Sequence, residues 1–193
     1  MIEVATSKGP ARLVEFPADD PRATLILGHG AGGTGIAPDL QALADALPAH
    51  GITVLLHDQP WKVAGKKVAA APAALDAAWI ESLNEIDVTG PLVVGGRSAG
   101  ARVACRTAGL VGAQAVVALA FPLHPPGKPD KTRAGELDVT VPLRVVQGSS
   151  DAFGRPGEFP AGIDIVAVPG DHGLKKDPGA VVEAVREFVS GMY

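Results

Sequence analysis

The stretch that decides the fold is Leu92–Cys105, which reads LVVGGRSAGARVAC. An apolar segment typical of a buried strand ends in two glycines, one serine follows, and a run rich in small residues begins at once. Gly96, Ser98 and Gly100 form the pattern G-x-S-x-G, which places a serine at the apex of a sharp turn from strand to helix. Side chains two positions before and after the serine would collide there, so glycine fits at both. The stretch predicts a nucleophile elbow, with the backbone N–H of Ala99 free to point at an oxyanion.

The pattern has an alternative explanation, because glycine accounts for 24 of the 193 residues. A chain of this composition contains G-x-S-x-G by chance in roughly one case in ten, and such a motif stays a hypothesis until its context agrees. A glycine-rich turn with an uninvolved serine is therefore the alternative at this point.

Length, composition and charge indicate one globular domain over residues 1–193, with 47% hydrophobic and 20% charged residues. A formal charge of −4 and the lack of a basic stripe argue against a nucleic-acid or membrane partner. The first residues have no apolar signal core, and no apolar run is long enough to span a bilayer. A single cysteine cannot form an internal disulfide, so we expect a cytoplasmic protein with Cys105 as a small core residue.

Short apolar segments alternate with segments of helical periodicity along the chain. Strands are expected at Thr24–Leu27, Ile52–Leu56, Leu92–Gly96, Ala115–Leu119, Leu143–Gln147 and Ile163–Val168, with a possible hairpin from Ile2–Ser7 and Ala11–Phe16. Helices are expected with an apolar face from Ile36 to Leu47, over Ala73–Ile86, after Ser98 to about Ala108, and after an Asp177 cap; residues 57–71 are expected to form a loop. This alternation predicts an α/β fold, with a mostly parallel sheet flanked by helices.

In open α/β sheets, ligands gather at the carboxyl ends of the strands. The polar or turn-forming residues that follow the predicted strands include His29, Ala31, His57, Ser98, His124, Asp151 and His172. Ser98, Asp151 and His172 occur in the chain order of an α/β-hydrolase triad. In such a triad the imidazole takes the serine proton during attack, and the carboxylate fixes the imidazole tautomer. The backbone N–H of Ala31 is the candidate for the second oxyanion donor, beside that of Ala99.

The segments HGAGG, GGRSAGARVA, FPLHPPGKP, QGSSDAFG and GDHGL resemble a small branch of the α/β-hydrolases, over roughly residues 22–190. That branch includes testis-expressed protein 30 and the hydrolase-like domain of an NSL-complex subunit, and dienelactone-hydrolase-like proteins are more distant relatives. The resemblance implies a serine-hydrolase fold with Ser98, Asp151 and His172 at the matching positions, and it implies no substrate. This chain departs from dienelactone hydrolases proper, which use a cysteine nucleophile where this elbow carries Ser98.

Four further side chains are candidates for a substrate pocket: His29, His57, Trp61 and His124. Of these, His29 is expected to pack or hydrogen-bond beneath the oxyanion loop rather than to react. For His57 and His124, the alternative is that they are only loop residues at strand ends. No motif indicates a metal site, and no cofactor is expected.

Two aspartates compete for the role of the triad acid. Asp171 is adjacent to His172, but adjacent side chains in extended or turn backbone usually point apart, so Asp151 is the predicted partner. The connection from Ala120 to Val141, about 22 residues, can hold one short helix at most. We therefore expect a minimal lid or none, an open site, and a preference for short acyl chains.

These observations predict a serine hydrolase of carboxylesterase or thioesterase type, acting on a small-molecule ester or thioester through an acyl-enzyme on Ser98. One alternative is a non-catalytic binding module on the same fold. Another is a nucleotide-binding oxidoreductase, because Gly28–Gly33 matches G-x-G-x-x-G and Asp58 ends the next predicted strand region. The oxidoreductase alternative does not account for the elbow or for Asp151 and His172 downstream of it. The oligomeric state is not predicted.

Overall fold

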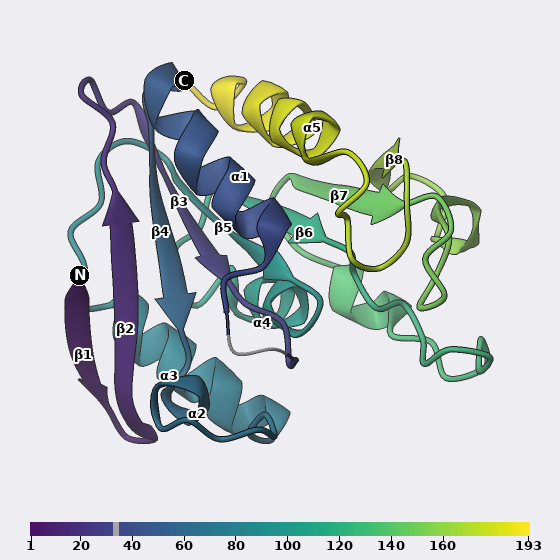
Figure 1. The fold of residues 1–193 in the computed structure, drawn as a ribbon, viewed down its shortest axis with the longest axis horizontal. Coiled ribbons are helices and arrows are strands. Elements are labelled where there is room, and N and C mark those ends of the chain that lie inside the picture. Colours follow the sequence, from purple (N-terminus) through teal and green to yellow (C-terminus); the bar gives the residue numbers. More distant parts are fainter. Residues whose placement is uncertain (33–34) are drawn as a thin grey trace.

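The computed structural model describes residues 1–32 and 35–193, and within them it places eight strands in one sheet (Figure 1). Across the sheet the order is β1, β2, β4, β3, β5, β6, β7 and β8. Their bounds are β1 Ile2–Thr6, β2 Gly9–Phe16, β3 Ala23–Gly28, β4 Ile52–Asp58, β5 Leu92–Arg97, β6 Ala115–Leu119, β7 Leu143–Gly148 and β8 Asp164–Val168. The β1–β2 and β2–β4 pairs are antiparallel, and each pair from β4 to β8 is parallel. The predicted mostly parallel α/β sheet is confirmed.

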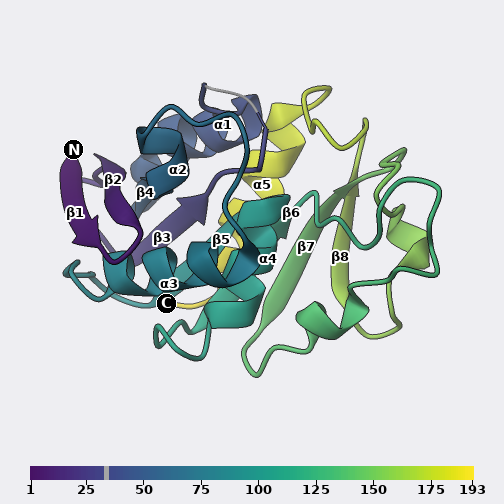
Figure 2. The ribbon, with the colours of Figure 1, turned by 90° about the horizontal axis from the view of Figure 1, so that it is seen from below.

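Helices cover both faces of the sheet (Figure 2). The α-helices are α1 Pro38–Ala46, α2 Pro60–Val63, α3 Pro72–Leu83, α4 Ala99–Thr107 and α5 Pro178–Ser190. Shorter 3-10 turns are η1 Leu47–His50, η2 Ala134–Leu137 and η3 Pro156–Glu158. On one face α1 packs against α5, and on the other α3 packs against α4.

The central strands β3, β4 and β6 are buried on both sides. In β3, Leu25 and Leu27 join the core beneath α1 and α5, whereas Ile26 joins the core beneath α3 and α4. All six residues of β3 are buried. A strand covered on both faces needs apolar side chains at every position, which is why these strands were recognisable as continuous apolar runs. The carboxyl ends of the parallel strands share one edge of the sheet, and there the chain can build a site.

The helix starts follow local sequence signals. Proline occupies the first turn of α1, α3 and α5, where its missing N–H costs no hydrogen bond. Asp177 caps α5, because its side chain accepts a hydrogen bond of 2.9 Å from the backbone N–H of Ala180. None of the helices in the described residues is long and apolar enough to cross a bilayer.

Three local expectations were wrong. Residues 57–71, expected to form a loop, contain the short helix α2, whose start is set by Pro60. Helix α3 ends at Leu83, before the predicted Ile86. Ile36, expected on an apolar helix face, precedes α1 and is 47% exposed, because the helix begins only at Pro38.

The connection between β6 and β7 carries only the 3-10 turn η2 and no lid domain. Glu136 of that turn forms ion pairs with Arg102 and Arg106 of α4, at 2.6 Å and 3.1 Å. These two guanidinium groups lower the pKa of Glu136 against the opposing effect of its burial. The connection is thus held down on α4, and the expectation of a minimal lid is confirmed.

Candidate active site

Ser98 lies between the end of β5 and the start of α4, in a backbone conformation that residues with side chains rarely adopt. Its φ is 53° and its ψ is −109°. The backbone N–H of Ser98 donates a hydrogen bond of 2.9 Å to the carbonyl oxygen of Leu119 in β6. Strained conformations of this kind persist where the surrounding structure over-determines them, and they cluster at functional sites. The sharp turn from strand to helix that was predicted around Ser98 is therefore present.

The glycines of the elbow allow the backbones to approach closely. A Cβ on Gly96 would lie 2.6 Å from the carbonyl oxygen of Gly28 and 2.7 Å from the carbonyl carbon of Gly100. A Cβ on Gly100 would collide with the carbonyl group of Gly28. The collision expected between the two motif glycines is thus real, and the end of β3 adds a second one. This contact brings the segment with Ala31 alongside Ser98.

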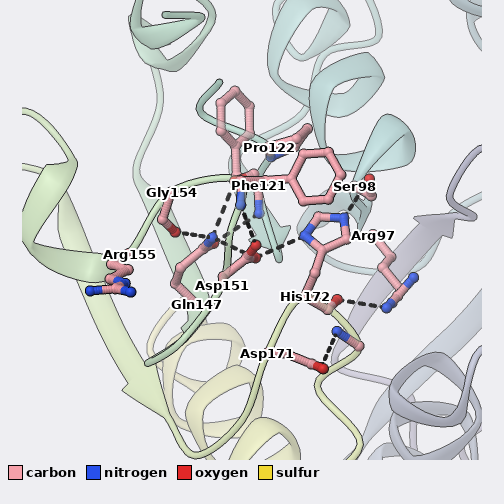
Figure 3. A network of polar contacts seen from close by, with 12 residues as sticks. Arg97, Ser98, Phe121, Pro122, Gln147, Asp151, Gly154, Arg155, Asp171 and His172 are labelled. Atoms are coloured by element: carbon pink, nitrogen blue, oxygen red, sulfur yellow. Dashed lines mark hydrogen bonds and ion pairs between the residues drawn. The ribbon is translucent and has the colours of Figure 1, made fainter. Parts of the chain in front are cut away.

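The structure brings Ser98, His172 and Asp151 together in a chain of hydrogen bonds (Figure 3). The Nε2 atom of His172 lies 3.0 Å from Oγ of Ser98, and its Nδ1 atom lies 2.8 Å from Oδ2 of Asp151. An ionised carboxylate can only accept, so Nδ1 carries the proton and Nε2 is left to accept the proton of the serine hydroxyl. The carboxylate of Asp151 is fully buried, whereas the imidazole is 22% exposed.

Asp151 is itself held by two donors from its surroundings. The Nε2 atom of Gln147 donates to Oδ2 of Asp151 at 2.9 Å, and the backbone N–H of Phe153 donates to Oδ1 at 2.8 Å. Gln147 is completely buried at the end of β7, and its Oε1 accepts a 2.9 Å hydrogen bond from the backbone N–H of Phe121. These bonds orient the carboxylate toward the imidazole and stabilise its charge.

Asp171 does not reach the imidazole. Its Oδ1 accepts a 2.8 Å hydrogen bond from the backbone N–H of Gly173, and Figure 3 shows the side chain directed away from the ring. A Cβ on Gly148 would collide with the carbonyl oxygen of Asp171, so the end of β7 passes directly against this turn. The ring of Phe153 covers the imidazole of His172, with 4.2 Å between the ring centroids.

The two expected oxyanion donors line one small apolar cavity. Ala31 and Ala99 lie on its wall, and its volume is about 10 Å³, close to the space of one water molecule. A Cβ on Gly30 would be 3.6 Å from the Cβ of Ser98, so this wall adjoins the serine. The rest of the cavity is mostly apolar and includes Trp61, Leu75, Trp79 and Val103. Of the candidate pocket residues, Trp61 and His29 line this cavity.

A comparison with known families identifies the chain. The family model of the alpha/beta hydrolase domain matches residues 21–177. This chain belongs to the α/β-hydrolase family. Among curated proteins, none matches the sequence of this hydrolase.

Solved structures share the fold of this α/β-hydrolase at low sequence identity. A serine hydrolase without a lid, from Xanthomonas campestris, is 20% identical with a TM-score of 0.73, and the alignment covers 97% of this chain and 93% of that one. Est1E from Butyrivibrio proteoclasticus, solved with ferulic acid bound, is 14% identical with a TM-score of 0.78, covering 100% and 99%. A dienelactone hydrolase from Anabaena variabilis is 19% identical with a TM-score of 0.70, covering 99% and 94%. At these identities the similarity establishes the fold.

In this hydrolase, the neutral side chain of His29 holds the backbone at Gly30, next to the expected oxyanion donor Ala31. Its Nε2 accepts a 3.1 Å hydrogen bond from the backbone N–H of Gln59, so Nδ1 carries the proton and donates to the carbonyl oxygen of Gly30 at 2.7 Å. Its ring also meets the ring of Trp61 edge-on. Burial lowers the pKa of His29, and the hydrogen bond to Gly30 opposes that shift only in part.

Two candidate pocket residues of the hydrolase lie elsewhere. His57 shares the face of β4 that carries Leu55, so its side chain lies in the core beneath α3, where Nε2 is 3.0 Å from Oγ of Ser82. His124 is turned toward its own loop, and its ring nitrogens meet the carbonyl oxygen of Pro125 and the carboxylate of Glu158. Neither side chain lines the cavity beside Ser98.

Residues that sequence reasoning missed complete the surroundings of the hydrolase site. Gln147 had a usable signal, because a polar residue follows the apolar pair Val145 and Val146 four positions before Asp151. Phe153 and Arg97 had none, since their contacts with His172 join segments far apart in the chain.

The interpretations that need a metal ion or a nucleotide can be compared with the described residues. Within residues 1–32 and 35–193, no group of three or more His, Cys, Asp or Glu side chains could hold a metal ion. Asp58, the candidate ribose ligand of the oxidoreductase alternative, forms a 2.6 Å ion pair with Lys62. Gly33, the last glycine of that alternative motif, lies outside the described residues.

Proposed function

We propose that this α/β-hydrolase cleaves small carboxylic esters or thioesters through an acyl-enzyme on Ser98. The observation that carries the proposal is the hydrogen-bond chain from Ser98 through His172 to the buried Asp151, at 3.0 Å and 2.8 Å. Nucleophile, base and orienting acid at these distances constitute the arrangement on which acyl transfer depends.

Each residue has a defined role in the proposed reaction. Oγ of Ser98 attacks the carbonyl carbon while its proton moves to Nε2 of His172, and Asp151 stabilises the resulting imidazolium. The backbone N–H groups of Ala99 and Ala31 would hold the oxyanion. When the tetrahedral intermediate collapses, the bond to the alcohol or thiol breaks and that group takes the proton from Nε2. A water molecule then attacks the acyl carbon while its proton moves to Nε2 of His172. The bond between the acyl carbon and Oγ of Ser98 breaks, Oγ takes the proton from Nε2, and the carboxylic acid leaves.

The cavity beside the oxyanion donors supports a short acyl group. Its volume of about 10 Å³ leaves room for little more than a methyl group, and the rings of Trp61 and Trp79 limit its extension. The chain also lacks a lid domain between β6 and β7 that could provide a longer apolar wall. We place the leaving group outside this cavity, so both oxygen esters and thioesters are proposed as substrates.

The shared motifs also support our proposal that the chain belongs to the branch of testis-expressed protein 30.

Labelling with a fluorophosphonate tests the nucleophile. We expect the wild-type protein to be labelled at Ser98 and to hydrolyse p-nitrophenyl acetate. We expect Ser98→Ala to fold but to show neither labelling nor hydrolysis. Ser190→Ala, at the end of α5, serves as the matched control and should retain both. Labelling that persists in folded Ser98→Ala would refute the assignment. A folded wild-type protein without labelling or turnover would favour the non-catalytic binding module.

A further inference from the structure

Arg97, the residue before the proposed nucleophile, reaches the segment that carries the histidine. Its Nη2 atom donates a 2.7 Å hydrogen bond to the backbone carbonyl oxygen of His172 (Figure 3). The side chain of Arg97 is only 16% exposed. A charge-assisted bond of this length is stronger than a neutral one, so it restrains the main chain of His172 relative to β5.

A buried carboxylate holds the other side of the guanidinium. Nε of Arg97 lies 3.2 Å from Oδ2 of Asp39, an ion pair by distance that lacks hydrogen-bond geometry, and the side chain of Asp39 is fully buried in the first turn of α1. Burial raises the pKa of Asp39, and the nearby guanidinium opposes that shift. An unpaired carboxylate at such a position would be strongly destabilising, so Arg97 and Asp39 depend on each other for compensation of charge.

The guanidinium also adjoins the oxyanion segment. A Cβ on Gly30 would lie 3.6 Å from Nη1 of Arg97 and 3.6 Å from Cβ of Ser98. One side chain therefore pairs with the start of α1, donates to the loop after β8 and lies beside the loop after β3. These are the segments whose relative positions set the distance between serine, histidine and oxyanion donors.

We propose that Arg97 is a positioning residue, which holds the main chain of His172 at hydrogen-bonding distance from Ser98, with Asp39 as its buried anchor. The inference rests on the proposed function of Ser98 and His172. Support for this loop matters because, among the residues that the structure describes, β8 lies at the edge of the sheet and pairs with β7 alone. The pairing with Asp39 also neutralises a positive charge that would otherwise oppose the imidazolium formed during attack.

Loss of this support predicts a defect in the chemical step rather than in substrate binding. A misplacement of about 1 Å in a catalytic constellation can cost about a hundredfold in rate. We expect Arg97→Gln and Asp39→Asn each to lower kcat and kcat/KM by about tenfold to a hundredfold on p-nitrophenyl acetate, with KM not raised. Arg97→Lys should recover only part of the loss, because an ammonium group cannot span Asp39 and the carbonyl oxygen as a guanidinium does.

The matched control is Arg102→Gln. Arg102 is also a partly buried arginine of the elbow region, but its ion pair is with Glu136, on the side of η2. This variant should keep kcat within about twofold of wild type. Circular dichroism and thermal unfolding of every variant show whether it is folded at the assay temperature. Addition of guanidinium ion at millimolar concentration to folded Arg97→Ala should partly restore kcat, whereas sodium at the same ionic strength should not.

Three results would overturn the inference. The first is an unchanged kcat in folded Arg97→Gln and folded Asp39→Asn. The second is a raised KM with unchanged kcat, which would make Arg97 a substrate-binding residue instead. The third is an equal loss in Arg102→Gln, which would indicate a general effect of removing an ion pair. A wild-type protein that is inactive and unlabelled would instead overturn the proposed function, so the two failures are distinguishable.

Discussion

Asp151 and Asp171 are both close to His172, one in space and one in sequence, and the directions of their side chains distinguish them. Asp151 approaches Nδ1 of the imidazole to 2.8 Å from the loop after β7. Asp171 instead closes its own turn through the backbone N–H of Gly173. The difference arises because β7 and β8 are neighbours in the sheet, so the loops that follow them meet.

Substitution of each aspartate should separate their roles. We expect Asp151→Asn to lose about 10² to 10⁴ in kcat with KM little changed, because the amide no longer favours the required imidazole tautomer. The kcat of Asp171→Asn should stay within about tenfold of wild type, because the carboxylate of Asp171 affects His172 only through its electrostatic field. The measurement is kcat of both folded variants on one activated ester. The assignment of the acid is wrong if Asp171→Asn is the inactive variant.

At the scale of single residues, the part of the site that could be predicted is the set of residues that directly follow strands. Ser98, Asp151 and His172 each follow a strand, so their meeting at one edge of a parallel sheet was a consequence of topology. The contacts of Gln147 and Arg97 were beyond prediction, because they depend on side-chain directions across loops that are distant in sequence.

At the scale of elements, the buried strands were predictable and the short helices were not. A run such as β3, covered on both faces, leaves a continuous apolar signature. Helix α2 spans only Pro60–Val63, which is too short for a periodic pattern, and Trp61 within it packs against His29 of a separate loop. The side chain of His57 points to the same face of the sheet as that of Leu55, because residues two apart in a strand share a face.

The packing of β4 against α3 makes stability depend on pH through His57. Burial lowers the pKa of His57 from 6.5 to about 3. Between these two values the unfolded chain binds the proton and the native protein does not. The contribution of His57 to the free energy of unfolding is therefore complete above pH 6.5, and it is lost by about 1.4 kcal/mol per unit as the pH falls toward 3.

Replacement of His57 by glutamine should flatten this dependence. We expect the free energy of unfolding of His57→Gln to fall less steeply than that of wild type between pH 6.5 and pH 4.5. Above pH 6.5 the two curves should run parallel, since His57 is then neutral in both states, and this range is the internal control. Urea denaturation at a series of pH values gives both curves. Identical slopes below pH 6.5 would show that the proton on His57 does not control acid stability.

At the scale of the whole molecule, the site combines a small apolar cavity with the lack of a lid domain between β6 and β7. Ion pairs of Glu136 with Arg102 and Arg106 bind the connection between these strands to α4. Trp61 and Trp79 are among the residues that line the cavity, and both are buried. We therefore expect longer acyl chains to require displacement of packed aromatic rings.

The length of the acyl chain should therefore control turnover. For p-nitrophenyl esters, we expect kcat/KM to be highest for acetyl and to fall for longer chains, with no increase in activity above the micelle concentration. Trp61→Ala should shift the preference to longer chains, and Leu110→Ala, at a position 70% exposed, should not. A steep rise in kcat/KM from acetyl to dodecanoyl esters would contradict this account of the cavity.

The position of β8 at the edge of the sheet has a consequence for how the molecule opens. Local opening is easiest where backbone hydrogen bonds are exposed and few apolar contacts hold a segment, and hardest in central strands. Every residue of β3 is buried, whereas only Val168 of the five residues in β8 is buried. The loop that bears His172 thus follows a strand that opens more easily than the central strands. Amide exchange should be faster in β8 than in β3, so we expect fluctuations of β8 to separate His172 from Ser98 while the central strands remain closed.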